Sequence, residues 1–179
     1  MIASIETTDS HLALARLPEW PPRTIAILAT MDGRPYAIPV SAPVRAGDRR
    51  ILIALQRTRG SLARLRHQPE VALVVLAEGN IAFTARGRAA VIAEPMTASR
   101  DYAAVAIEVE KVDDHRQRAF EVDNGIGRRW LDSDEQQALG ARIQELRQLA
   151  AAHPTETLVA ILTGDEKRLL SPPWSTLAV

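Results

Sequence analysis

Runs and alternations of apolar residues divide this chain into short extended segments joined by turns. Residues 24–30 are apolar and β-branched, and residues 35–44 return after the pair Asp32-Gly33, which favours a tight hairpin turn. Pro39 lies inside the returning segment and has no N–H to donate, which predicts an edge strand or a bulge there. Either outcome leaves a backbone position free for a ligand.

Further strands are predicted at residues 51–55, 71–76, 81–93, 103–112 and 157–163. Gly87, in the middle of the longest segment, predicts a bulge or a close backbone approach. The pattern predicts about six strands. The short turns between most of them imply that neighbouring strands are antiparallel. We therefore predict a mainly β fold, a six-stranded antiparallel barrel with flanking helices, forming one domain over residues 1–179.

Helical patterns flank the predicted strands. Near the N-terminus a short helix is predicted to carry Leu12, Leu14 and Leu17 and to end at Pro18. Ser133 with Gln136 predicts a capping box for a second helix. The core face of that helix is predicted to hold Leu139, Ile143, Leu146 and Ala150.

An insertion of loop plus helix is predicted at residues 113–153. Its first part, residues 113–130, has no clean period and contains two glycines, so we expect an irregular loop at a ligand mouth or at an interface. Asp113, Asp114 and His115 are interpreted as a solvated strand end before this loop. Trp130, and Trp174 in the C-terminal tail, can stack on a ligand or pack in a core or interface.

Composition and charge exclude several classes of function. The chain holds 22 basic and 22 acidic side chains, which argues against a surface built for nucleic acid, and 4% aromatic residues leave few stacking platforms for single strands. The absence of cysteine excludes disulfides and thiolate chemistry. No apolar run approaches the roughly 20 residues of a membrane span, and the N-terminus lacks a signal-peptide pattern, so we expect a cytoplasmic protein without a membrane partner.

Histidine spacing argues against a metal site. The chain has four histidines, at positions 11, 67, 115 and 153, and no two are spaced three or four residues apart. Metal ligands on a helix need such spacing to converge on one ion. We therefore predict no metal site.

A basic turn stands out between the strand predicted at residues 51–55 and a short helix carrying Leu62 and Leu65. The turn reads Arg57-Thr58-Arg59-Gly60-Ser61, with Arg64 and Arg66 following. The start of a helix leaves its first N–H groups unpaired and presents the positive end of its dipole, so guanidinium groups beside it suit a phosphate. The alternative is that these arginines form the solvated face of a short helix.

The order of these parts resembles a known family. A hairpin with ATMDGRPYAIPV, then ILIAL and the basic turn, then LARLRHQPEVALVVL and FTARGRAAVIAEP, is similar to the FMN-binding split barrel of the pyridoxamine 5′-phosphate oxidase-like superfamily. The match covers residues 23–112, and residues 158–174 resemble the closing strand. The resemblance implies an intertwined homodimer with two FMN sites at the subunit interface, each held by the turn of one chain and partly covered by the other.

The resemblance also implies a set of FMN-binding residues. Arg57, Thr58, Arg59 and Ser61 fall on the phosphate turn, with Arg64 one helical turn further. Leu55 and Gln56 fall along the ribityl chain and ring, and the strand carrying Pro39, Val40 and Ser41 faces the pyrimidine side of the ring. Many family members carry a lysine at the position of Ser61. Arg59 or Arg64 can replace that charge here, and the alternative is that FMN binding is lost.

The function implied is that of an FMN-dependent oxidoreductase passing electrons or hydride to a small, unknown substrate. The flavin supplies the redox chemistry, so neither a protein nucleophile nor a catalytic triad is expected and no catalytic residue is assigned. The tail lacks an Arg-x-His substrate signature, which argues against oxidation of pyridoxamine phosphate. The alternative is a non-catalytic protein that binds flavin, deazaflavin or haem.

Overall fold

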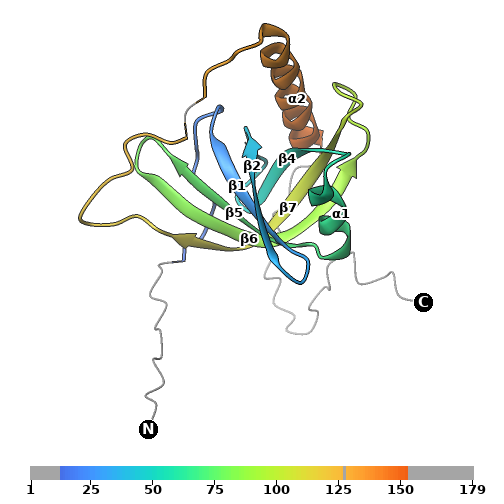
Figure 1. The fold of residues 1–179 in the computed structure, drawn as a ribbon. Coiled ribbons are helices and arrows are strands. Elements are labelled where there is room, and N and C mark those ends of the chain that lie inside the picture. Colours follow the sequence, from blue (N-terminus) through green and yellow to red (C-terminus); the bar gives the residue numbers. More distant parts are fainter. Residues whose placement is uncertain (1–12, 127, 153–179) are drawn as a thin grey trace, which may run out of the picture.

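The computed structural model describes residues 13–126 and 128–152, and in these residues one antiparallel sheet is flanked by two helices (Figure 1). The strands are β1 (Ile25–Met31), β2 (Pro35–Ser41), β3 (Val44–Arg45), β4 (Arg50–Gln56), β5 (Glu70–Ala77), β6 (Ile81–Ala93) and β7 (Tyr102–Asp114). The helices are α1 (Gly60–His67) and α2 (Ser133–Ala152). The strand order across the sheet is β2-β1-β5-β6-β7-β4-β3.

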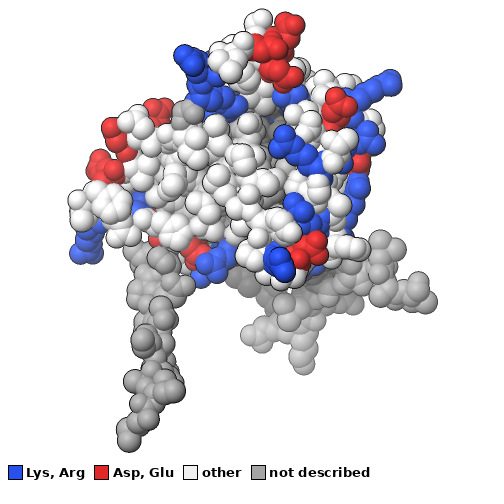
Figure 2. Space-filling view, in the orientation of Figure 1, with Lys and Arg blue, Asp and Glu red and all other residues white. Residues whose placement is uncertain are grey.

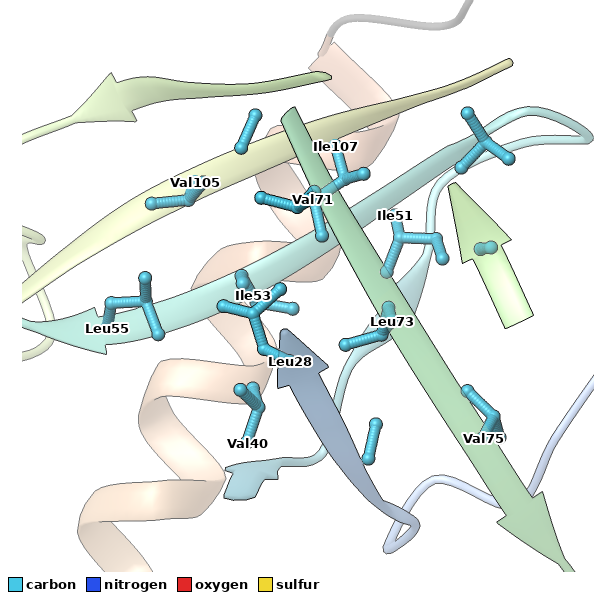
Figure 3. Close-up of a cluster of buried hydrophobic side chains, with 14 of the residues drawn as sticks. Leu28, Val40, Ile51, Ile53, Leu55, Val71, Leu73, Val75, Val105 and Ile107 are labelled. Atoms are coloured by element: carbon cyan, nitrogen blue, oxygen red, sulfur yellow. The ribbon is translucent and has the colours of Figure 1, made fainter. Parts of the chain in front are cut away.

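The sheet curls into a half-barrel. Strand β2 stands at one edge of the sheet, and β4 lies near the other edge, yet the two approach each other across the interior. Alternating residues of the strands fill that interior, and Leu28, Val40, Ile53 and Leu55 point toward one another there (Figure 3). Burial of this apolar face is the main force that holds the curl.

The sheet has seven strands in the described residues, so the prediction of a six-stranded barrel is wrong in its count. Six of the predicted strand ranges lie in these residues. The difference arises at residues 35–44, which the apolar pattern presented as one strand. Ala42 adopts a positive φ of 54°, and Pro43 follows it, so the chain breaks into β2 and β3. A positive φ is incompatible with a continuing strand. The strand predicted at residues 157–163 lies outside the described residues, as do Trp174, His11 and His153.

Two local predictions about the strands are confirmed. β2 is an edge strand, so the missing N–H of Pro39 removes no bond from the sheet. At Gly87 the β6–β7 register shifts, and a Cβ atom there would collide with the backbone carbonyl of Glu108. Glycine is therefore required at this position by the close approach of two strands.

The two predicted flanking helices have different outcomes. Residues 13–17 are not helical, because Ala13 pairs with Asp113 and the Leu14 N–H donates to the Val112 carbonyl at 2.8 Å. The helix predicted from Ser133 is present as α2, with Leu139 and Leu146 buried.

The cap of α2 differs from the predicted capping box. The Asp132 carboxylate accepts from the backbone N–H groups of Asp134 at 2.8 Å and Glu135 at 3.4 Å, so Asp132 caps the helix one residue earlier than predicted. The buried face also includes Arg142, whose guanidinium lies 4.2 Å from the centre of the Tyr102 ring. Neither helix in the described ranges is long and apolar enough to cross a membrane.

Residues 115–132 form the predicted irregular loop, with neither helix nor strand at its described positions. It runs along the left of Figure 1, in orange, from the end of β7 to α2. The loop begins two residues later than predicted because Asp113 and Asp114 belong to β7. Asp113 is only 1% exposed, so its interpretation as a solvated residue is wrong.

Candidate functional site

The corner between β4 and α1 leaves the start of a helix open. The Arg57 N–H donates to the Asp101 carbonyl at 2.8 Å and the Arg59 N–H donates to the Gln56 carbonyl at 3.2 Å, which turns the chain into α1. Arg59 is the N-cap residue, with extended φ and ψ of −87° and 141°, and it makes no side-chain cap bond. No acidic residue lies in the first turn, so the N–H groups and the positive helix end remain available to an anion.

Two buried polar atoms in this turn have no hydrogen-bond partner among the described residues. Ser61 is 3% exposed, and its hydroxyl oxygen is one of them. The other is Nε of Arg64, one helical turn later. An unpartnered buried hydroxyl or guanidinium nitrogen lowers stability. Both atoms are therefore suited to a ligand that carries acceptor oxygens.

The arginines of the corner are not equally free. Arg57 Nε lies 3.1 Å from one carboxylate oxygen of Glu94, and Arg66 pairs with the other. Arg59 Nε donates to the neutral amide oxygen of Gln56 at 2.7 Å, and the Arg64 guanidinium lies 4.1 Å from the centre of the Tyr36 ring. Arg59 and Arg64 thus keep their charge uncompensated by any described carboxylate. Sequence reasoning missed Glu94 because it lies 37 residues beyond Arg57.

The remaining predicted residues are divided between two faces. Leu55 and Val40 are buried in the same apolar core (Figure 3). Gln56 lies on the opposite face of β4, where its side-chain oxygen accepts from Arg59. Pro39 and Ser41 are exposed on the edge strand β2. Within the described residues, no hydrogen bond or ion pair joins residues 39–41 to the turn. The link between β2 and the corner is Tyr36 beneath Arg64.

This arrangement fits the phosphate end of FMN. An uncapped helix start, an unpartnered serine hydroxyl and two guanidiniums match the oxygens of a phosphate dianion. The ring end is different. Four clefts of the described residues, with volumes between about 220 and about 500 Å³, are lined by other residues than those predicted for FMN. One chain therefore gathers polar groups suited to a phosphate, and the residues predicted to contact the flavin ring line none of these four clefts.

A second charged group lies where β6 and β7 pair. Asp113 is held between Lys111 Nζ at 2.7 Å and Arg86 Nε at 3.0 Å. The hydrogen bond from Lys111, with the charge of Arg86, lowers the pKa of Asp113 despite its burial. On the same face, the Thr84 hydroxyl and His115 Nε2 are 2.8 Å apart. These groups fix the start of the 115–132 loop. The described residues contain no group of His, Asp and Glu able to hold a metal ion.

No family model matches the sequence, and no curated protein matches it. Solved structures are similar in fold over about half of the chain. A putative pyridoxamine 5′-phosphate oxidase from Listeria innocua is 11% identical, with a TM-score of 0.42 over 49% of this chain and 85% of that one. A FAD-binding protein from Mesorhizobium loti is 18% identical, with a TM-score of 0.42 over 50% and 83%. A heme-binding protein from Mycobacterium smegmatis is 16% identical, with a TM-score of 0.42 over 51% and 48%.

These solved structures include proteins of the family that the sequence resembles. The similarity concerns the fold. At these TM-scores and identities it assigns neither a ligand nor an activity to this chain.

Proposed function

We propose that this protein is an FMN-dependent oxidoreductase of the pyridoxamine 5′-phosphate oxidase-like type, transferring electrons or hydride to a small substrate. The observation that carries the proposal is the open start of α1, where the buried Ser61 hydroxyl has no described partner. A buried hydroxyl without a partner is a cost that a bound phosphate would remove.

Different residues of the corner supply the charge and the hydrogen-bond donors that would hold the phosphate. Arg59 and Arg64 supply positive charge, Ser61 donates its hydroxyl hydrogen, and Thr58 with the first N–H groups of α1 completes the cradle. Pro39 and Ser41, which are exposed on the open edge of β2, supply backbone groups for the polar edge of the ring. Bound FMN would supply the redox chemistry, and the protein would supply position and electrostatics.

We further propose that the ring slot is completed by a second copy of the chain. The outer face of the sheet is apolar across three strands, with Ile27 of β1 lying opposite Pro39 of β2 and Val74 of β5. Pro39 is exposed, and the other two are half-buried. In Figure 2 the middle of the molecule, where β1 and β2 lie in Figure 1, shows no charged side chain. An apolar sheet face beside an open strand edge is suited to self-association.

Sedimentation tests the dimer. Ile27→Lys places a charge on the apolar face and should give a monomer, because a buried lysine without a partner opposes association. Leu131→Lys is the matched control, since Leu131 is 89% exposed in the loop, and it should leave the dimer intact. A wild-type monomer at micromolar concentration would contradict the dimer but not the phosphate site.

Titration with FMN and with riboflavin, which lacks the phosphate, tests the cofactor site. Ser61→Ala should weaken FMN binding by roughly 1–2 kcal/mol, about ten-fold, and Arg59→Ala by about as much or more, because each removes a hydrogen bond to a charged group. Riboflavin binding should not change. Ser61→Ala should also leave the unliganded protein as stable as wild type or more so, since it removes an unpartnered hydroxyl.

Ser133→Ala, at an exposed position of α2, is the control for the serine change and should bind FMN like wild type. Unchanged FMN affinity in both corner variants would contradict the proposal.

A non-catalytic cofactor-binding protein is the second candidate. Close to the corner, the described acids and bases are already engaged: Glu94 pairs with two arginines and Tyr36 lies beneath Arg64. That leaves few groups to move a proton for a substrate. Purified protein that binds flavin, deazaflavin or haem but is not reoxidised faster by any small acceptor would favour this function over the oxidoreductase.

A further inference from the structure

The 115–132 loop is fastened to the end of the sheet opposite α1. The backbone N–H of Val122 donates to the Asn80 side-chain oxygen, and the backbone N–H of Asn80 donates to the Val122 carbonyl, both at 3.1 Å. At Gly125 a Cβ atom would lie 2.7 Å from the carbonyl oxygen of Leu76, so the loop is in tight contact with the end of β5. The Arg128 guanidinium donates to the Arg23 carbonyl at 2.8 Å. The loop is thus attached to the segment before β1, to the end of β5 and to the turn between β5 and β6.

A cleft of about 320 Å³ lies between this loop and the sheet. Its lining includes Arg23, Leu76, Asn124, Ile126, Arg128 and Trp130. The volume is at the lower end of the roughly 300–1,000 Å³ found for small-molecule sites, so it admits a compact ligand of one ring. Leu76, Ile126 and the indole ring of Trp130 form an apolar surface in the cleft, and the two arginines form a positively charged one.

Positive charge in this cleft lacks a counterion. Arg128 Nε is buried without a hydrogen-bond partner, and neither Arg128 nor Arg23 forms an ion pair with a described carboxylate. Glu78 also lines the cleft but is not paired with either of them in the described ranges. Burial, and then repulsion from Arg23, lower the pKa of Arg128. An anion in the cleft would relieve both effects.

The flat side chains indicate what kind of anion would fit. The Arg128 guanidinium lies 5.4 Å from the centre of the Trp130 ring. A guanidinium pairs with a planar carboxylate through parallel hydrogen bonds, and an indole ring stacks on an aromatic ring. Leu76 and Ile126, which are 42% and 46% exposed, offer apolar contact to the body of the ligand.

We propose that this cleft is a binding site for a small aromatic carboxylate, held by Arg128 and Arg23 at its acid group and by Trp130 at its ring. The site is separate from the FMN corner. The chain leaves α1 and enters β5 at Glu70, whereas the cleft lies at the other end of that strand, beside Leu76 and Ala77. Eight residues of strand span about 26 Å, so one small ligand cannot reach both.

Calorimetric titration of the full-length protein with three probes tests this site at constant ionic strength. Benzoate carries both the ring and the charge, benzamide carries the ring alone, and inorganic phosphate carries charge alone. We expect benzoate to bind about ten-fold more tightly than either of the others. Equal binding of benzoate and phosphate, or of benzoate and benzamide, would overturn the proposal.

Substitutions locate the binding. Arg128→Gln should weaken benzoate binding by about ten-fold or more, and Trp130→Leu by several-fold. Arg129→Gln is the matched control, because Arg129 is an exposed neighbour that does not line the cleft. Should Arg128→Gln disturb the loop, Arg23→Gln tests the same charge at an exposed side chain whose backbone carbonyl is retained. Unchanged benzoate affinity in Arg23→Gln and Arg128→Gln would overturn the proposal.

The FMN titration separates the two sites. Arg128→Gln should bind FMN as wild type does, and Ser61→Ala should bind benzoate as wild type does. Benzoate binding that is lost in Ser61→Ala and retained in Arg128→Gln would place the aromatic acid at the corner instead and overturn the cleft assignment.

Discussion

Strand β5 separates two clusters of arginines that differ in how their charge is balanced. At the α1 end, Glu94 holds Arg57 and Arg66, while Arg59 and Arg64 contact a neutral amide and an aromatic ring. At the other end, Arg23 and Arg128 share a cleft with no paired carboxylate among the described residues. Some arginines of this chain are thus neutralised by a carboxylate, whereas others keep an uncompensated positive charge that can attract an anion.

The difference has a chemical consequence. At the corner, the charges of Arg59 and Arg64 lie beside a helix start and an unpartnered hydroxyl, and this combination suits the compact oxygens of a phosphate. In the cleft no helix start contributes, and an indole with apolar side chains lies beside the charge. That combination favours a flat organic anion over an inorganic one.

The segments that carry the two clusters also differ in how deeply they are packed into the core. We expect the largest effect on stability from this difference. Leu62 fixes α1 to the core and is 1% exposed, so Leu62→Ala should lower the free energy of unfolding by about 2–5 kcal/mol. Ile126 of the loop is 46% exposed, and Ile126→Ala should lower it by about 0.5 kcal/mol or less. Urea denaturation measures both. Equal losses would mean that the loop is as much a part of the core as α1.

The strands and the corner were predictable because they depend on short-range patterns. The range predicted for β6 matches the structure to the residue, and the predictions for Gly87 and for the edge position of Pro39 are confirmed. Each rests on a rule that acts within a few residues, namely apolar periodicity, steric freedom or a missing N–H. The start of α1 after the basic turn followed from the same kind of local signal.

What the sequence did not reveal depends on tertiary contacts. Ala42 has no residue-type signal for a positive φ, so the break between β2 and β3 could not be foreseen. Glu94 and Arg57 meet only because β4 and β7 bring distant segments together. No local pattern distinguishes Arg128 from the other arginines, and its hydrogen bond to the Arg23 carbonyl arises only because the fold brings the loop beside the segment before β1. In each case the fold decides which charge finds a partner.

Asp113, near the end of β7, is the opposite case to Arg128, because its charge is fully paired. Asp113 is buried between two cations that hold its pKa below the ordinary value, led by the hydrogen bond from Lys111. A lowered folded-state pKa means that the stabilisation is present above the unfolded pKa of about 3.9 and is lost as the pH falls through the folded value. Asp113→Asn should therefore cost about 1–3 kcal/mol at pH 7.

Below pH 4, the stability of wild type should fall more steeply than that of Asp113→Asn, so that the two urea midpoints converge on acidification. If the difference between the two urea midpoints stays constant between pH 7 and pH 3, the charge of Asp113 contributes nothing to the free energy of unfolding. Pairing of a buried charge would then not distinguish Asp113 from Arg128 in stability.

The smallest expected effect tests whether pairing at the corner diminishes its attraction for phosphate. Glu94→Gln removes the negative charge that neutralises Arg57 and Arg66, whose side chains are 42% and 53% exposed, so each ion pair contributes about 1 kcal/mol or less to stability. A phosphate dianion near the turn should then be repelled less. FMN should bind roughly three-fold more tightly, and riboflavin should bind as before.

Glu108→Gln is the control, because Glu108 pairs with Arg50 at the far end of β4 and carries the same charge change away from the turn. It should leave FMN affinity unaltered. Weaker FMN binding in Glu94→Gln would contradict the view that pairing with Glu94 diminishes the attraction of the corner for phosphate. Glu94 would then hold Arg57 and Arg66 in the geometry that the phosphate needs, and these paired arginines, not the unpaired Arg59 and Arg64, would determine FMN affinity.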